Sequence, residues 1–213
     1  NDGVRSGSVG RKLTGVEVKI AEDGEICVKG DLLMMGYYKE PEKTKEVIDD
    51  DGWFHTGDIG CFIDGDFLKI TDRKKEIFKT SGGKYIAPQQ MENKYKESRF
   101  IEQIMVIGEN KKHPAALIVP AFAFVNDWCK LKGINVSSNE ELAKNERVIA
   151  RINQELDGFN EQFGQWEQVK KFELIDHEWT VDTEELTPTM KLKRKNIMAK
   201  YADLVEKIYG PAL

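Results

Sequence analysis

The sequence has few of the residues that build metal centres and disulfide frameworks. It contains only three cysteines and three histidines in 213 residues. The cysteines are far apart and form no C-x-x-C pair, so their spacing predicts neither a zinc site nor a set of disulfides. We therefore expect no metal site formed by this chain alone, and a compartment that keeps thiols reduced. The residues concerned are Cys27, Cys61, Cys129, His55, His113 and His177.

Long apolar runs and an excess of positive charge are missing as well. No run approaches the ~20 apolar residues of a membrane-spanning helix, so we expect no transmembrane segment. The net charge of −5 argues against a general nucleic-acid binder. The chain shows no signal-peptide pattern and starts with Asn rather than Met, which predicts a cytoplasmic piece of a longer polypeptide.

The first 72 residues are predicted to be rich in β-structure. Alternating runs at residues 16–21 and 25–30 flank Asp23-Gly24, which is typical of a hairpin. A second hairpin is predicted around Asp64-Gly65. Between them, Pro41 is placed to begin a short helix.

After residue 72 the pattern changes to strands alternating with helices, which predicts an α+β fold. Short strands are expected on either side of a Ser-Gly-Gly loop, followed by a helix over 88–98, a strand pair and a helix near 122–132. The capping-box pair Ser138 and Glu141 and a helical apolar spacing predict one long amphipathic helix up to Phe163. A last helix is predicted over 193–209. The best domain boundary lies at residues 72–75.

Three stretches have residue types suited to chemistry. In "GWFHTGDIG" (52–60), Asp58 can accept two hydrogen bonds from a vicinal diol such as a ribose, or cap its own turn. In "LTPTMKLKRKN" (186–196), Lys191 follows a turn and precedes the last helix, so it can be delivered into a cleft. The alternative for Lys191 is a solvated helix start.

The third stretch is a basic segment around a glycine loop. It is not a P-loop, because Phe78 stands where the first Gly is required and Tyr85 replaces the Ser/Thr. Such a run is either a solvated face or the wall of a cleft for a phosphate-rich ligand. Gly82 and Gly83 have no Cβ, so their backbone N–H groups could approach such a ligand closely. From position 69 to 84 there are two acidic residues and six basic ones, the latter being Lys69, Arg73, Lys74, Lys75, Lys79 and Lys84.

Four motifs occur in the order found in adenylate-forming acyl-CoA synthetases. They are "GEICVKGDLLMMGYYKEPEKT", "GWFHTGDIG", "LKITDRKKEIFKTSGGKYIAPQQME" and "LTPTMKLKRKN". Nearly the whole chain closely resembles the C-terminal third of a long-chain fatty-acid–CoA ligase. One departure is Gln90, where the family usually has an acidic residue, although Glu92 is retained. This departure puts a local polar contact in doubt.

The resemblance implies a role for each motif. Asp58 would bind the ribose of ATP or AMP with Arg73 beside it, and Lys75 would be a hinge. Lys191 would contact the carboxylate and α-phosphate during adenylation. The loop that would face coenzyme A consists of Lys79, Ser81, Gly82 and Gly83.

The resemblance also implies an incomplete enzyme. Residues 1–72 would be the β subdomain at the end of the N-terminal domain, and 73–213 the mobile C-terminal domain. The phosphate loop, the fatty-acid pocket and the segment that holds adenine and Mg²⁺ are missing, so the fragment alone is expected to be inactive. Two alternatives remain open: an acyl-AMP ligase that loads a carrier protein, and a non-catalytic regulatory module. Peripheral contact with membranes also remains open, because long-chain substrates suggest it but no dedicated anchor is seen.

Overall fold

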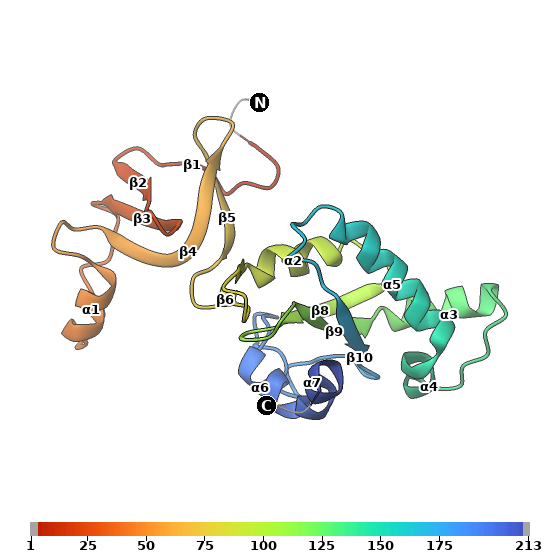
Figure 1. The fold of residues 1–213 in the computed structure, drawn as a ribbon. Coiled ribbons are helices and arrows are strands. Elements are labelled where there is room, and N and C mark those ends of the chain that lie inside the picture. The colour runs from red at the N-terminus through yellow and green to blue at the C-terminus, as the bar shows by residue number, and fades with distance from the viewer. Residues whose placement is uncertain (1–3, 211–213) are drawn as a thin grey trace. The chain divides into compact units, whose positions relative to one another are not determined.

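The computed structural model describes residues 4–210, which form two compact units. The first unit comprises Asn1–Ile77 and the second Phe78–Leu213 (Figure 1). The division falls five residues after the predicted end of the first domain at residue 72. Within the described residues, no helix combines the length and apolarity needed to cross a membrane.

The first unit is an antiparallel sheet with one short helix. The strand order is β1-β5-β4-β3-β2, so the predicted hairpins β2–β3 and β4–β5 both form and lie side by side. Helix α1 begins at Pro41, as predicted, because proline is well tolerated in the first helical turn. The elements are β1 (Gly10–Arg11), β2 (Val16–Ile20), β3 (Glu25–Gly30), α1 (Pro41–Val47), β4 (Phe54–Ile63) and β5 (Phe67–Arg73).

A glycine allows the two longest strands of this sheet to pair closely. The register between β4 and β5 shifts between Ile59 and Gly60. A Cβ on Gly60 would lie 2.4 Å from the carbonyl oxygen of Lys69 and would also meet Ile26. Only glycine fits this approach, and the irregularity it permits lies two residues after Asp58.

The second unit confirms the predicted α+β class. Strands β8 and β9 pair antiparallel, β10 pairs parallel with β9, and β6 pairs with β7 in a separate two-stranded hairpin. All six residues of β9 are buried, which places the hydrophobic core on this central strand. The strands are β6 (Phe78–Lys79), β7 (Tyr85–Ile86), β8 (Ile101–Ile107), β9 (Ala115–Pro120) and β10 (Lys171–Leu174).

The helices of the second unit pack against this sheet. Helix α2 packs on β8 and α7 on β10, while α5 packs on α2 (Figure 1). Their bounds are α2 (Pro88–Tyr95), α3 (Phe122–Leu131), α4 (Asn139–Lys144), α5 (Glu146–Asn160), α6 (Arg194–Lys200) and α7 (Ala202–Tyr209).

Two helices predicted to be continuous are each divided in two. Asn145 has extended backbone angles (φ −74°, ψ 120°) and its side chain caps α5, so it ends α4 and starts α5. Tyr201, with φ −110° and ψ 31°, separates α6 from α7 without a side-chain cap. The periodicity was unbroken in both cases. For the helix predicted up to Phe163, the prediction was wrong because asparagine can end one helix and cap the next without interrupting the apolar pattern.

Candidate functional site

Asp58 and Arg73 face each other across β4 and β5. They are direct cross-strand partners, and Arg73 Nε lies 2.9 Å from Asp58 Oδ1. The Asp58 side chain is 22% exposed and that of Arg73 is 48% exposed, so a ligand can reach the pair from solvent. The backbone N–H of Asp58 donates to Thr56 Oγ1 at 3.1 Å, which fixes the strand at this point. The arrangement presents a carboxylate and a guanidinium side by side.

Lys75 lies in a turn that follows directly after Arg73. The N–H groups of Glu76 and Ile77 both donate to the Arg73 carbonyl, at 2.9 and 3.2 Å. Lys75 is exposed, and the first unit ends two residues later at Ile77. The predicted hinge residue thus lies between the ion pair and the start of the second unit.

The Ser81-Gly82-Gly83 loop connects β6 and β7, and its three residues are exposed. Gly83 has φ +76° and closes the turn by donating its N–H to the Thr80 carbonyl. A Cβ on Gly82 would find its nearest neighbour, Thr80 Oγ1, only at 3.9 Å. Backbone groups of this loop can therefore approach a ligand without steric hindrance.

A neighbouring loop supports the glycine loop from one side. The N–H of Ser81 donates to the Lys111 carbonyl at 2.8 Å, and the N–H of Asn110 donates to the Lys79 carbonyl at the same distance. Lys79 lies over the ring of Tyr85, 4.5 Å from its centroid. The loop is held at both ends while its tip stays open.

Lys191 lies at the end of a tight loop. The bridge between Leu186 and Leu192 closes the loop at its base. Inside it, Thr187 N–H donates to the Lys191 carbonyl at 2.8 Å, and Lys191 N–H donates to Thr187 Oγ1 at 3.0 Å. Lys191 is exposed. A backbone held this way delivers the lysine side chain from a defined position.

A buried ion pair fixes the helix that follows Lys191. Arg194, the first residue of α6, donates through Nη2 to both carboxylate oxygens of Glu92, at 2.6 and 2.7 Å. Glu92 also accepts from Val106 N–H at 2.7 Å and is 4% exposed. Gln90, the departure noted in the sequence, is exposed, so the buried contact is made by Glu92.

Glu185 gives the loop a second support. Its carbonyl accepts from Lys193 N–H at 2.7 Å, and its carboxylate accepts from Lys200 and Tyr201, at 2.5 and 2.9 Å. Burial raises the pKa of Glu185, but hydrogen bonds from Lys200, Thr183 and Tyr201 outweigh it and lower that pKa to about 2. Glu185 is therefore ionised at neutral pH and holds α6 close to the base of the loop.

Sequence reasoning missed one cluster in the first unit. His55 Nδ1 lies 2.9 Å from Glu25 Oε2 and 3.5 Å from Cys27 Sγ, although these residues look scattered in the sequence. The antiparallel register of β3 and β4 pairs Cys27 with His55 and so brings them together. Lys74 Nζ also contacts Glu25 Oε2, at 2.8 Å.

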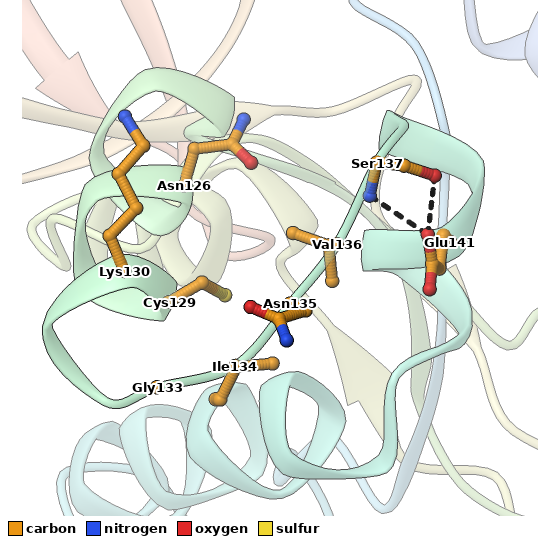
Figure 2. A pocket seen from close by; sticks show the side chains of 9 residues that line it. All are labelled: Asn126, Cys129, Lys130, Gly133, Ile134, Asn135, Val136, Ser137 and Glu141. Carbon is orange, nitrogen blue, oxygen red and sulfur yellow. Dashed lines mark hydrogen bonds between the residues drawn. The ribbon is translucent and has the colours of Figure 1, made fainter.

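The second unit also contains a pocket of about 380 Å³ (Figure 2). Inside it, Ser137 donates to Glu141 Oε2 from both its N–H and its hydroxyl. None of the predicted site residues lines it. The lining consists of Asn126, Cys129, Lys130, Gly133, Ile134, Asn135, Val136, Ser137 and Glu141.

Comparison with known proteins identifies the second unit. Residues 75–212 match the model of the AMP-binding enzyme C-terminal domain. A putative fatty-acid–CoA ligase of Mycobacterium tuberculosis is 39% identical over 210 residues, which are 98% of this chain and 37% of that protein. Long-chain-fatty-acid–CoA ligase 1 of Homo sapiens is 39% identical over 191 residues, 88% of this chain and 27% of that protein. The chain thus spans about a third of the length of these relatives.

A solved structure shows the same fold. The A domain of a carboxylic acid reductase from Segniliparus rugosus, solved with AMP and a co-purified carboxylic acid, superposes with a TM-score of 0.75 at 23% identity. The match covers 95% of this chain and 34% of that one. At this identity the likeness establishes the fold.

Proposed function

This chain belongs to the AMP-binding enzymes, whose C-terminal domain it contains, and on that premise we propose that it is the C-terminal portion of a long-chain fatty-acid–CoA ligase. In the first half-reaction a fatty-acid carboxylate attacks the α-phosphate of ATP, giving acyl-AMP and pyrophosphate. In the second, the thiol of coenzyme A attacks the acyl carbon and AMP leaves. The catalytic cycle belongs to the full-length parent, since this chain spans about a third of its relatives.

The observation that carries the proposal is the Asp58–Arg73 pair. An ionised carboxylate accepts only, so it suits the two hydroxyl donors of a ribose, while the guanidinium favours the nearby phosphate. Both side chains are partly exposed, and they lie on two neighbouring strands. These properties fit the recognition of ATP and AMP. Mg²⁺ would accompany ATP, with ligands in parts of the parent that this chain lacks.

We expect Asp58→Ala in the full-length parent to weaken AMP binding about 10- to 100-fold. The loss corresponds to about 1.5–3 kcal/mol for hydrogen bonds to a charged group. Isothermal titration calorimetry with AMP measures it. Asp66→Ala is the matched control, because Asp66 also pairs with an arginine of this sheet, Arg11, at 3.0 Å. Equal affinities of the Asp58 and Asp66 variants would contradict the assignment.

The turn at Lys75 suits the predicted domain rotation. It is exposed and lies just before the change from one compact unit to the other. A rotation about this turn would let one small domain present a different face in each half-reaction. The glycine loop would face the pantetheine of coenzyme A in the second pose, and Lys191 the α-phosphate in the first.

Lys75→Pro in the parent should impair thioester formation far more than adenylation. Proline fixes φ near −65° and restricts the preceding residue, so a backbone that needs two states is locked in one. Pyrophosphate release and thioester formation from supplied acyl-AMP are measured separately. Lys75→Ala is the control, because it removes the same side chain and leaves the backbone free. Equal losses in both half-reactions of the proline variant would count against a hinge here.

The acceptor thiol and the cellular setting follow from the proposal. The high identity to named fatty-acid–CoA ligases favours coenzyme A over a carrier protein. An assay of the parent with free coenzyme A separates the two, because a carrier-loading ligase would form no acyl-CoA. A reading frame that began near Asn1 would instead favour a non-catalytic module. We place the reaction in the cytoplasm, with fatty acid, ATP and coenzyme A as substrates.

A further inference from the structure

We propose that Glu25 is a positioning residue that holds the first-unit side of the hinge in place through Lys74. This inference rests on the proposed function, because it concerns the rotation about Lys75. Glu25 lies on β3 and Lys74 directly precedes the hinge residue, so their contact joins the residue before the hinge to an interior strand of the sheet.

Glu25 is a buried carboxylate surrounded by donors. It is 4% exposed, and it accepts from Gly57 N–H at 2.9 Å through Oε1. Its other oxygen, Oε2, contacts Lys74 Nζ at 2.8 Å and His55 Nδ1 at 2.9 Å. Burial raises the pKa of Glu25, but the bonds from Lys74, His55 and Gly57 together lower it, so the carboxylate is charged. A charged buried group with defined partners fixes their positions.

Lys74 is tied to the first unit by its side chain and its backbone. Its Nζ lies 2.7 Å from Asp23 Oδ2 and 2.8 Å from Glu25 Oε2. Its N–H donates to the Gly57 carbonyl at 2.9 Å, which extends the pairing of β4 with β5 by one residue. Hydrogen bonds from the ammonium to Asp23 and Glu25 raise the pKa of Lys74, so it stays protonated at physiological pH. The chain is thus held up to the residue before the hinge.

The neighbouring residues Arg73 and Lys74 belong to two separate ion pairs. Arg73 pairs with Asp58, whereas the next residue, Lys74, pairs with Glu25. Arg73 is the last residue of β5 and Lys74 begins the turn, and the two ion pairs share no residue. A nucleotide that binds Asp58 would compete with Arg73 for the Asp58 carboxylate, but it would leave the Glu25–Lys74 pair intact. The second pair can therefore hold the base of the hinge whether or not nucleotide is bound.

The same cluster also resembles a metal donor set, and the contacts argue against that use. Ligand atoms of Glu25, Cys27 and His55 lie within 4.8 Å of one another. However, the Lys74 ammonium already contacts Glu25 Oε2, and a metal ion would have to displace it. Burial raises the pKa of the Cys27 thiol, so it is not a thiolate ready to bind metal. The geometry points to an ion-pair anchor.

The test uses Lys74→Met and Glu25→Gln in the full-length parent. Amide hydrogen exchange over residues 73–77 should accelerate about tenfold or more, because the segment loses its anchor. Both half-reactions should slow about 10- to 100-fold, since misplacing a reacting group by about 1 Å costs that much. The affinity for AMP should be unchanged, because Asp58 and Arg73 remain. Lys74→Arg should restore the rates, as it keeps the charge.

Lys45→Met is the matched control. Lys45 also forms an ion pair in the first unit, with Glu42 at 3.2 Å, but both side chains are at least 75% exposed. It should behave as wild type. Wild-type exchange and rates in Lys74→Met, or no rescue by Lys74→Arg, would overturn the anchor. If the wild-type parent released no pyrophosphate in the presence of fatty acid, the proposed function would be refuted. The amide exchange rates of residues 73–77 in Lys74→Met and wild type would then be the test of the anchor.

Discussion

Lys191→Ala in the full-length parent should reduce acyl-AMP formation about 10²- to 10³-fold, or about 3–4 kcal/mol, by analogy with the loss of one preorganised transition-state donor. Negative charge builds on the phosphoryl oxygens during transfer, and an ammonium in a dry cleft stabilises it more there than in the ground state. The loop around Lys191 is closed by the Leu186–Leu192 bridge and two Thr187 hydrogen bonds. These contacts hold the backbone of Lys191 in place, which would reduce the cost of placing its ammonium group at the phosphate.

Thioester formation from supplied acyl-AMP should be nearly unchanged in the same variant. The rotation that brings the glycine loop to the reacting centre would carry Lys191 away from it, so each face serves one half-reaction. The measurement is the two half-reaction rates with a melting curve. Lys144→Ala is the control, because Lys144 is an exposed lysine of the second unit, on α4, with no proposed role in the reaction. Adenylation within a few-fold of wild type would show that Lys191 is the wrong lysine, with Lys193 or Lys195 as the next candidate.

Arg194→Met should lower the free energy of unfolding of the second unit by about 3 kcal/mol. Removing one partner of a buried ion pair leaves an uncompensated charge, which costs about 3–5 kcal/mol. The lower end applies because the Arg194 side chain is still 21% exposed and Glu92 keeps its bond from Val106 N–H. The loss corresponds to a fall in melting temperature of about 10 °C. Adenylation should fall as well, since α6 follows the Lys191 loop.

Calorimetry of the 213-residue chain measures the stability, because the second unit has its own buried core. Lys94→Met is the matched control. Lys94 lies on α2, as Glu92 does, and pairs with Glu97 at 2.8 Å on the surface. Loss of this exposed pair should lower the free energy of unfolding by less than about 1 kcal/mol. The double variant Glu92→Met with Arg194→Met should recover part of the loss, because it removes the stranded carboxylate. A melting temperature equal to that of Lys94→Met would contradict the structural role of the pair.

Local signals in the sequence were sufficient for several features. The two Asp-Gly hairpins, the start of α1 at Pro41 and the cap at Ser138 all form, because each depends on residues close together in the chain. Only one of the two hydrogen bonds of the capping box forms. Ser138 Oγ accepts from Glu141 N–H, but the Glu141 carboxylate accepts from Ser137 N–H instead of Ser138 N–H. The motif order predicted a resemblance to adenylate-forming acyl-CoA synthetases, and the family match confirms it.

The sequence by itself determined the family, the α+β class and the residue types at the candidate site, since motifs and turns are read over a few neighbouring positions. Only the tertiary structure decided which distant groups meet. Strand β10 joins β9 in parallel from 56 positions away, Arg194 reaches Glu92 across 102, and Lys74 reaches Glu25 across 49. The sequence pattern around a carboxylate on a strand is the same whether the folded structure buries that carboxylate or leaves it in solvent. Its partner is set by strand register and helix packing, which depend on the burial of the whole core rather than on any short segment.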